Sequence, residues 1–470
     1  MKSRPLDPLF NPSSIAVIGA SRRDNAAGHG VLKNLVTGGV FQTYFCKPFK
    51  GKVFAVNPNA AEILGVKCYS SVLEIEEQVN LAIICVPAET VIPVLKECGK
   101  KKVKAAIIIA AGFREAGQKG MLLQKKIDDV AKQYKIRYLG PNALGIIRTS
   151  WAMNASFSPT MPRSGDVAFV SQSGALADSI IDWAVSHRYG FSAVVSCGNQ
   201  ENIDAADLIE WLADDEETKA ITVYLEGVPD GQKLMAAMKA ASKKKPIIAL
   251  KGGKSAAGHA AAQTHTAAIA TEYEIFKAAF SQCNTHIVDT VEELFDTAKA
   301  LAQQPVCAQK EIAIITNGGG AGVLCADYCH ELGIPLAMIK ESTLKKIDDS
   351  GKMHRAYSRR NPMDILGDAL PERYEVAVNA LLSDPGIGGL IVIQTMQTMT
   401  NSRKDAEVIV EARKRFPEKP IICTYLGGML SKPGMDVLDS HNIPDYNDTR
   451  KAALAMKALI ERAVFVKRKV

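Results

Sequence analysis

The chain has 470 residues, of which 47% are hydrophobic and 23% charged, and its formal net charge is +7. Such a composition is typical of a globular protein with about two to four domains. The lysine clusters at residues 100–104, 243–245 and 467–470 are short and carry no interleaved aromatic residues, which argues against nucleic-acid binding. No stretch approaches about 18 uninterrupted apolar residues and the N-terminus has no apolar signal region, so we expect a cytoplasmic protein without a membrane segment.

The ten cysteines are scattered and include no CxxC pair. Cys325 and Cys329 are four residues apart on a predicted helix, but no further histidine or cysteine completes a zinc site with them. Others, such as Cys85 and Cys423, lie in apolar runs, as reduced core cysteines do. The sequence therefore predicts no metal site.

Short apolar runs alternate with amphipathic segments along the whole chain, a pattern typical of α/β layers built on parallel sheets. In the first third we expect a helix at residues 90–98 and strands at 14–18, 52–56, 81–86, 105–109 and 136–139. These elements predict a Rossmann-like domain that covers residues 1–146.

Two further series of strands follow. The second comprises residues 166–170, 193–196, 220–225 and 247–250, and a helix at 291–301 closes it. After a linker at 303–309, the third has strands at 311–316, 389–393 and 420–425. In each series an apolar strand leads through a loop into a helix. The loop of the second series is rich in glycine and hydroxyl side chains, and that of the third is rich in glycine. We therefore expect two similar domains at residues 147–303 and 304–470.

The turn after the first strand, Gly19-Ala20-Ser21-Arg22, resembles a dinucleotide fingerprint. The GxGxxG pattern fails because Ser21 holds the second glycine position, and the second strand ends in Asn57-Pro58 instead of an acidic residue that would bind a ribose. NAD is therefore disfavoured. We expect a nucleotide-like ligand over these strand ends, with a plain strand–helix turn as the alternative.

Two later loops are predicted to bind anions at the starts of helices. Glycines and hydroxyls there leave backbone N–H groups free to point at one anion, and the helix dipole adds roughly half a positive charge. The first loop could instead only cap its helix, and the second could be a bare turn. The loops consist of Ser171, Gln172, Ser173 and Gly174, and of Asn317, Gly318, Gly319, Gly320, Ala321 and Gly322.

Residues 251–270 are mostly small, so little would hold them against a core. Within them lies His265, and a histidine on a mobile segment is suited to carrying a group between two places. Glu226 ends a predicted strand beside Gly227, where its carboxylate could orient an imidazole for attack. The alternatives are that His265 is a structural histidine and that Glu226 is a solvated acid.

Gly253-Lys254-Ser255 lacks the first glycine of a P-loop, so the chain shows no nucleotide-triphosphate site.

Taken together, these residues resemble the α subunit of ADP-forming acyl-CoA synthetases in the succinyl-CoA synthetase superfamily. The resemblance covers nearly the whole chain. It is carried by Gly19-Ala-Ser-Arg22, Val56-Asn-Pro58, Val86-Pro-Ala88, Ala111-Gly-Phe113, Gly140-Pro-Asn142, Ser171-Gln-Ser-Gly174, Tyr224-Leu-Glu-Gly227, Thr264-His-Thr266, Thr316-Asn-Gly-Gly319 and Asn361-Pro-Met-Asp364.

The resemblance implies a CoA-binding Rossmann-like domain followed by two flavodoxin-like domains, and the reaction acyl-CoA + ADP + phosphate ⇌ carboxylic acid + CoA + ATP. It implies that His265 is the phosphorylated nucleophile, that Glu226 orients it, and that the two helix starts hold phosphate at two stations. ADP and Mg²⁺ would bind mainly on a separate ATP-grasp β subunit, in an α2β2 assembly. CoA would bind through Gly19, Ser21, Arg22, Asn57, Pro58, Val86, Pro87, Ala111, Gly112 and Asn142.

Several positions depart from the family pattern. Ala267 stands where the family usually has glycine, which predicts a stiffer loop beside His265, and Ala143 replaces a cysteine near the CoA site. A lysine common after Gly-Ala-Ser-Arg is replaced near Ala26, and the stretch from Phe41 to Phe49 has the character of an insertion.

The alternative function is a CoA- or acyl-CoA-sensing module without ligase activity. Retention of His265, Glu226 and both phosphate loops favours the enzyme, since a sensor needs only the first domain. Succinyl-CoA ligase proper is disfavoured, because its counterpart of the third domain belongs to the other subunit.

Overall fold

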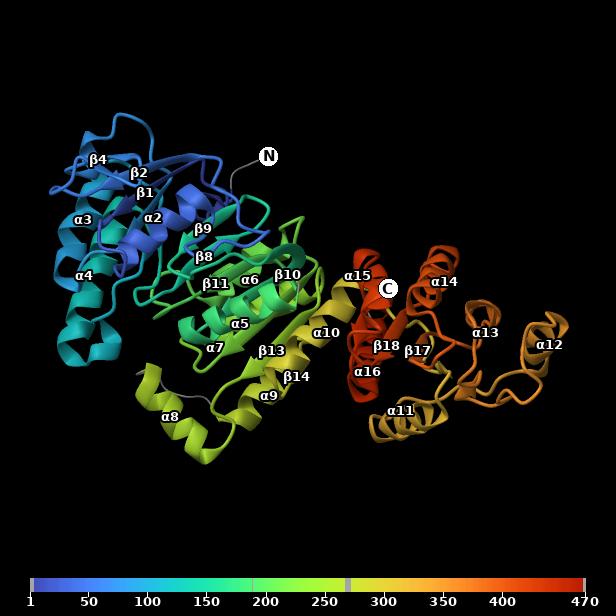
Figure 1. The fold of residues 1–470 in the computed structure, drawn as a ribbon. Helices are drawn as coiled ribbons and strands as arrows, with labels where there is room; N and C mark the ends of the chain where they lie inside the picture. Colours follow the sequence, from blue (N-terminus) through green and yellow to red (C-terminus); the bar gives the residue numbers. More distant parts are fainter. Residues whose placement is uncertain (1–3, 188, 267–271, 468–470) are drawn as a thin grey trace. The chain divides into compact units, whose positions relative to one another are not determined.

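The computed structural model describes residues 4–187, 189–266 and 272–467, and within this part the side chains of residues 262–266 are not described. The chain divides into two compact units, Met1–Asp289 and Thr290–Val470 (Figure 1). The first unit contains two sheets and the second contains one. The predicted α/β class with mainly parallel sheets is confirmed.

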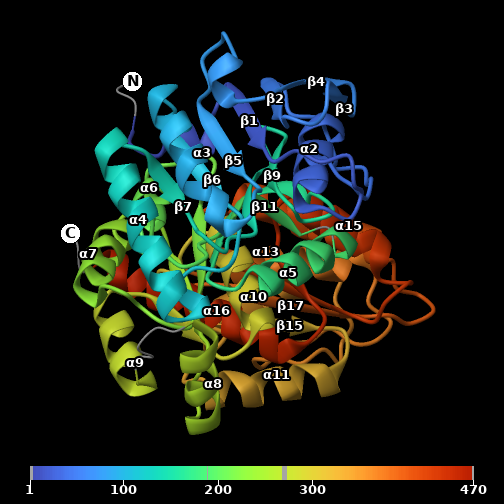
Figure 2. The same ribbon diagram turned by 90° about the vertical axis from the view of Figure 1, so that its left-hand side faces the viewer.

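The first sheet has the strand order β3-β4-β2-β1-β5-β6-β7, and all its pairs except β3–β4 are parallel. Its central strand β1 is buried at every residue, as a parallel strand covered on both faces should be. Helices α3 and α4 cover one face of the sheet, and α1 and α2 cover the other; α2, α3 and α4 are labelled in Figure 2. The elements are α1 Asp7–Phe10, β1 Ser14–Ile18, α2 Ala27–Thr37, β2 Lys52–Val56, β3 Glu62–Ile63, β4 Val66–Tyr69, η1 Val72–Glu74, β5 Leu81–Ile84, α3 Ala88–Lys100, β6 Ala105–Ile108, η2 Arg114–Ala116, α4 Gln118–Tyr134 and β7 Arg137–Leu139.

The second sheet has the order β14-β13-β12-β10-β11-β8-β9. Strands β8 and β9 run antiparallel to their neighbours at one end of this sheet, with β9 at the edge, and neither was predicted from the sequence. Strand β9 is polar yet buried, with Asn154 and Ser156 hydrogen-bonded to each other, so its sequence lacks the apolar signal of a strand. The elements are β8 Gly145–Arg148, β9 Met153–Ser156, β10 Arg163–Ser171, α5 Gly174–Ser186, β11 Gly190–Ser196, α6 Ala205–Ala213, β12 Ala220–Leu225, α7 Gly231–Ser242, β13 Ile247–Lys251, α8 Ala256–Thr266, α9 Tyr273–Gln282 and β14 His286–Val288.

Helix α8 corrects the expectation of an irregular segment around His265, because residues Ala256–Thr266 are helical. The physical reason is that alanine has the highest helix propensity, and five of these eleven residues are alanine. Ser255 starts the helix by accepting a hydrogen bond from the Gly258 N–H at 3.1 Å. Ala267 lies outside the described residues, so the stiffness predicted there stays a prediction.

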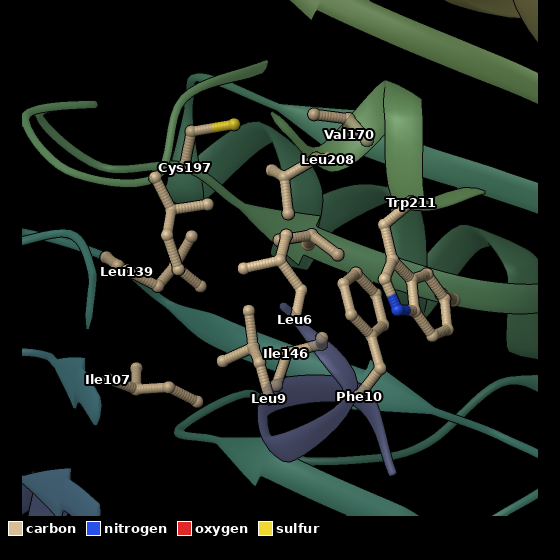
Figure 3. Close-up of a cluster of buried hydrophobic side chains, with 14 of the residues drawn as sticks. Leu6, Leu9, Phe10, Ile107, Leu139, Ile146, Val170, Cys197, Leu208 and Trp211 are labelled. Atoms are coloured by element: carbon tan, nitrogen blue, oxygen red, sulfur yellow. The ribbon is translucent and has the colours of Figure 1, made fainter. Parts of the chain in front are cut away.

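One continuous core joins the two sheets of the first unit. Phe10 of α1 stacks on Trp211 of α6 with ring centroids 3.7 Å apart, and the Trp211 Nε1–H donates to Asp7 at 2.9 Å. Leu139 and Ile146, one from each sheet, pack in the same cluster (Figure 3). The shared core fixes the loops at the junction of the two sheets relative to one another.

The second unit holds a five-stranded parallel sheet of order β16-β15-β17-β18-β19. Helix α10, which the sequence analysis assigned to residues 147–303, is part of this unit and packs on α16. The predicted domain boundaries stay a prediction. The elements are α10 Val291–Gln303, β15 Ala313–Thr316, α11 Gly319–Glu331, α12 Glu341–Asp349, β16 Met363–Asp364, α13 Pro371–Ser383, β17 Leu390–Thr395, α14 Ser402–Arg415, β18 Ile421–Leu426, α15 Lys432–Ser440, β19 Asp445–Tyr446 and α16 Thr449–Lys467.

Candidate functional site

A cavity of about 380 Å³ lies in the first unit, where loops of its two sheets meet. Its wall is made largely of residues that follow parallel strands β6, β10 and β11, so it lies at their carboxyl ends, the usual ligand edge of such sheets. The lining residues are Ile109, Arg114, Asn142, Ala143, Leu144, Phe157, Gln172, Ser173, Gly174, Ala175, Asp178, Gly198 and Asn199. The predicted phosphate loop and the predicted CoA ligand Asn142 therefore border one space.

The start of α5 forms one wall of this cavity. The Ser173 hydroxyl caps the helix by accepting the Leu176 N–H at 3.2 Å, and Ser171 Oγ donates to the Ser173 carbonyl at 2.7 Å. The capping interpretation of Ser173 is thus correct. Capping does not compete with anion binding, because the helix dipole and the first-turn N–H groups remain at the cavity.

Gln172 has a positioning role that the sequence did not reveal. Its Oε1 accepts the backbone N–H groups of Glu226 and Gly227 at 2.7 and 2.9 Å. This side chain therefore ties the end of β12 to the loop after β10. The prediction that Gln172 contacts phosphate remains a prediction.

Glu226 is buried, with 8% of its surface exposed. The Tyr224 hydroxyl donates to Glu226 Oε1 at 3.2 Å, and burial together with this carboxylate raises the pKa of Tyr224. Lys251 Nζ donates to the Glu226 carbonyl at 2.8 Å, and burial lowers the pKa of Lys251. The Tyr224 hydroxyl can lie close to the backbone of residue 252 because that residue is glycine, where a Cβ would lie 2.6 Å from the hydroxyl oxygen. The side chain of His265 lies outside the described part, so its pairing with Glu226 stays a prediction.

The predicted CoA loops gather at the carboxyl edge of the first sheet. Gly19 has φ +88°, and a Cβ there would lie 2.8 Å from the Cys85 carbonyl oxygen, so only glycine fits. Asn57 Nδ2 donates to the Ala20 carbonyl at 2.7 Å, and Arg22 donates to the Asn59 carbonyl at 2.6 Å. Pro58 follows Asn57, and Ser21 Oγ accepts the Arg23 N–H. Val86 and Pro87 lie between β5 and α3, while Ala111 and Gly112 follow β6.

Several lining residues were not predicted from the sequence, and those with polar or aromatic side chains are Arg114, Phe157, Asp178 and Asn199. Asn199 Nδ2 donates to Glu115 at 2.6 Å and Arg114 donates to the Asn199 carbonyl at 2.6 Å, which links loops from the two sheets. Burial of Glu115 raises its pKa, but the hydrogen bonds that its carboxylate accepts from Asn199 and from the Gly112 and Phe113 N–H groups outweigh this and lower it. Asn199 could have been found, since Gly198-Asn199 follows a predicted strand; Phe157 follows the unpredicted β9.

In the second unit, the predicted loop at Asn317 lies between β15 and α11. Asn317 joins β15 to β17, because its Nδ2 donates to the Thr395 carbonyl at 2.8 Å and its Oδ1 accepts the Thr395 N–H at 2.7 Å. A Cβ on Gly318 would lie 2.9 Å from Thr395, and one on Gly319 would lie 2.8 Å from Asp364 Oδ2. A Cβ on Gly320 would meet nothing within 4 Å.

Helix α11 has no side-chain cap at its N-cap residue, although the Gly318 N–H donates to Thr316 Oγ1 at 2.9 Å and the Ala321 N–H donates to the Gly318 carbonyl at 3.0 Å. Gly322 serves packing, because a Cβ there would lie 2.8 Å from Thr316 Cγ2.

Among the residues that the structure describes, no group of three or more His, Cys, Asp or Glu side chains is placed to hold a metal ion. Within the same residues, no helix has the length and apolar character needed to cross a membrane.

Comparison with known families first defines the class. The chain matches a CoA binding domain over residues 13–149, a succinyl-CoA ligase like flavodoxin domain over 164–301 and a ligase-CoA domain over 312–463. The expected sequence of one CoA-binding and two ligase-type domains is therefore confirmed.

Individual relatives then specify the family. The chain is 39% identical to the acetate–CoA ligase [ADP-forming] I subunit alpha of Pyrococcus furiosus, covering 97% of each chain. It is 39% identical to acetate–CoA ligase [ADP-forming] I of Archaeoglobus fulgidus over 97% of its own length, but spans only 63% of that longer protein. The chain belongs to the family of ADP-forming acetate–CoA ligases and corresponds to their α-subunit portion.

Solved structures agree with this assignment. The dinucleotide-forming acetyl-coenzyme A synthetase 1 of Ca. Korarchaeum cryptofilum, in complex with phosphate and ADP, has a TM-score of 0.91 and 35% identity, with 99% of each chain covered. A Pyrococcus horikoshii protein has a TM-score of 0.88 and 38% identity, covering 98% of this chain and 99% of its own.

Proposed function

We propose that this chain is the α subunit of an acid–CoA ligase (ADP-forming), which interconverts acyl-CoA + ADP + phosphate and carboxylic acid + CoA + ATP. The observation that supports this most directly is the cavity where the start of α5 meets Asn142 and other loops of the first domain. A thioester and a phosphate must meet in one place for acyl phosphate to form, and this space borders both predicted sites. The full-length family relationship supports the same activity.

CoA binds across the loops at the carboxyl edge of the first sheet in this proposal. Gly19 supports it, because backbone lacking a Cβ lets a pyrophosphate approach closely. The bond between Asn57 and Ala20 holds the neighbouring loops in place. Arg22 and Ser21 offer a cation and a hydroxyl at the same edge, with Pro58, Val86, Pro87, Ala111, Gly112 and Asn142 completing the proposed CoA site.

The chemistry proceeds by two displacements. A phosphate oxygen held at the start of α5 attacks the thioester carbonyl, and the carbon–sulfur bond breaks to release CoA thiolate. The neutral imidazole of His265 then attacks the phosphorus, and the acid leaves as its carboxylate. The protein's contribution is positioning and stabilisation of negative charge. Glu226 orients the imidazole and stabilises its positive charge.

The remaining steps need a second station and a partner. The uncapped start of α11, with its row of glycines, serves as the second phosphate station. ADP and Mg²⁺ bind mainly on an ATP-grasp β subunit, and the subunits form an α2β2 heterotetramer in the cytoplasm. The Pyrococcus furiosus relative, described as a subunit alpha that this chain nearly spans, supports a partner chain.

Phosphoryl labelling tests the proposal. The chain is incubated with acetyl-CoA and radiolabelled phosphate, with and without a β subunit, and the label's acid lability and base stability are measured. We expect a phosphohistidine label that His265→Ala abolishes. His259→Ala is the matched control, since His259 lies on the same helix α8 and should leave the label intact. Glu226→Gln should slow labelling without loss of CoA binding.

The outcomes separate the two candidate functions. No label under any condition, with CoA still bound, would favour the CoA- or acyl-CoA-sensing module. Unchanged labelling in Glu226→Gln would remove Glu226 from the mechanism while leaving the ligase intact.

A further inference from the structure

The cavity beside α5 carries a fixed negative charge that the reaction does not use. Asp178 lies on α5 four residues after Gly174 and three after Ala175, and all three line the cavity. Residues at this spacing share one helix face, with one turn rising about 5.4 Å. The carboxylate therefore stands about one turn along the cavity wall from the helix start that favours an anion.

The Asp178 carboxylate is held in place by a buried segment. Ser158 Oγ donates to Asp178 Oδ1 at 2.6 Å, and Ser158 is fully buried. The buried Asn34 fixes this segment in turn, because its Nδ2 donates to the carbonyls of Ser156 and Ser158 at 2.8 and 2.7 Å. The carboxylate is thus positioned from two sides, by its own helix and by the segment after β9.

Among the described side chains, those of residues 4–187, 189–261 and 272–467, no lysine, arginine or histidine forms an ion pair with Asp178. Arg114 is the other charged residue among those that line the cavity. Its guanidinium is already engaged, with Glu201 3.5 Å away and the Asn199 carbonyl accepting at 2.6 Å. The apolar part of the wall includes Phe157, 43% exposed, and Leu144.

We propose that Asp178 is a specificity-determining residue that disfavours acyl groups with a second carboxylate in this cavity. This inference rests on the proposed function in that it places the acyl group in the cavity. Phosphate or acyl phosphate occupies the helix start, and the acyl chain extends along the wall toward Asp178. A terminal methyl group tolerates the carboxylate, whereas a terminal carboxylate is repelled by it.

The size of the effect follows from Coulomb's law. Two like charges roughly 6 Å apart at an effective dielectric constant of about 20 give a discrimination of about a hundred-fold, and the open mouth of the cavity reduces this to about ten-fold. Specificity here comes from a repulsive group set against the wrong ligand.

Butyryl-CoA and succinyl-CoA are the matched probes, because they have the same number of acyl carbons and differ at the terminal group. Their affinities for the full-length chain are measured by isothermal titration calorimetry. We expect the wild-type chain to bind butyryl-CoA about ten-fold or more tightly than succinyl-CoA. Asp178→Asn should shrink this gap about ten-fold, mainly by strengthening succinyl-CoA binding.

Two control variants separate the charge of Asp178 from other effects. Asp182→Asn removes the same charge one helical turn further on, at an exposed position that does not line the cavity, and should leave the gap unchanged. Ser158→Ala removes the hydrogen bond but keeps the carboxylate, and should keep most of the discrimination.

Each outcome decides a separate point. The role of Asp178 would be overturned if the affinity ratio of butyryl-CoA to succinyl-CoA were equal in wild type and Asp178→Asn. It would also be overturned if wild type bound succinyl-CoA more tightly than butyryl-CoA, and Arg114 would then be the residue that binds the succinyl carboxylate. If such a result accompanies normal His265 labelling, the ligase proposal stands alone. If Asp178→Asn closes the affinity gap but no phosphohistidine label forms, the selectivity proposal stands and the ligase proposal falls. Failure of both thioesters to bind would overturn both proposals.

Discussion

Helices α5 and α11 both follow a central parallel strand through a short loop that contains glycine, yet their first turns differ. The α5 turn is capped by the Ser173 hydroxyl and opens onto a cavity. The α11 turn has no side-chain cap, and a Cβ at Gly318, Gly319 or Gly322 would come within 3.0 Å of the side chain of Thr395, Asp364 or Thr316. One pattern of strand, loop and helix therefore gives a cavity wall in the first unit and a more closely packed helix start in the second.

The two units also differ in the partners of a buried carboxylate. In the first unit the buried Asp215 forms an ion pair with the buried Arg148 at 2.6 Å, whereas the second unit buries Asp405 without such an ion pair among the described side chains. The Asp405 side chain is fully buried, and within the described part of the chain its one hydrogen-bond partner is Gln394 at 3.4 Å, while its Oδ1 has none. The four predictions below test this difference between the units.

The largest expected effect concerns Asp405. Burial raises its pKa to about 7 from the ordinary 3.8. Below pH 4 the carboxyl is protonated in both folded and unfolded chains. Between pH 4 and 7 the folded chain keeps the proton that the unfolded chain releases, so stability falls as pH rises, by at most about 4 kcal/mol in total. Asp405→Asn should therefore be more stable than wild type at pH 8 and gain nothing at pH 4.

Differential scanning calorimetry of the full chain across this pH range measures the gain. Asp349→Asn, which removes an exposed carboxylate at the end of α12, is the control and should show no pH-dependent gain. A constant difference between wild type and Asp405→Asn at every pH would contradict a buried titrating carboxyl.

Next in size is Gly322→Ala. The new Cβ would lie 2.8 Å from Thr316 Cγ2 and 3.4 Å from Pro362, so overpacking should destabilise the second unit by about 1–3 kcal/mol. Gly174→Ala is the matched change in α5, where the nearest atom lies 3.4 Å away, and should stay within about 1 kcal/mol of wild type. Equal losses of thermal stability would remove the steric distinction between the two helix starts.

A smaller effect is expected at the cap. Ser173→Ala removes the oxygen that accepts the Leu176 N–H and should cost about 1 kcal/mol of stability. Ser173→Asn supplies another capping oxygen and should recover most of this loss in chemical denaturation. If alanine and asparagine behave alike, the cap contributes nothing at this position.

The smallest expected change is in phosphate affinity at α11. A Cβ on Gly319 would lie 2.8 Å from Asp364 Oδ2, so a carboxylate adjoins this helix start and opposes an anion there. Asp364→Asn should strengthen phosphate binding a few-fold. Hydrogen exchange of the first α11 turn, titrated with inorganic phosphate, measures this locally. Weaker protection in the variant would instead give Asp364 a part in binding.

Much of the fold was predictable because buried parallel strands form continuous apolar runs. Strands β1, β2 and β12 occupy the predicted residues, and the other predicted strands agree to within about three residues at either end. The short strands β3, β4, β14, β16 and β19 were not predicted. Strands β8 and β9 escaped prediction, since the polar side chains of β9 are buried through hydrogen bonds such as that between Asn154 and the Thr160 carbonyl. Helix α8 was not predicted, because its small residues lack the apolar bulk that marks a packed helix. Its alanine content is the signal that favours a helix there.

The sequence by itself determined the α/β class, the family, and the loops at Gly19, Ser173 and Gly318, because strand ends and glycine turns are local features. Only the tertiary structure decided which loops meet. It placed Asp178 and Arg114 in one cavity, tied Gln172 to Glu226, and separated the opening beside α5 from the close packing beside α11. These facts depend on contacts between residues far apart in the chain, which arise only when the sheets share a core.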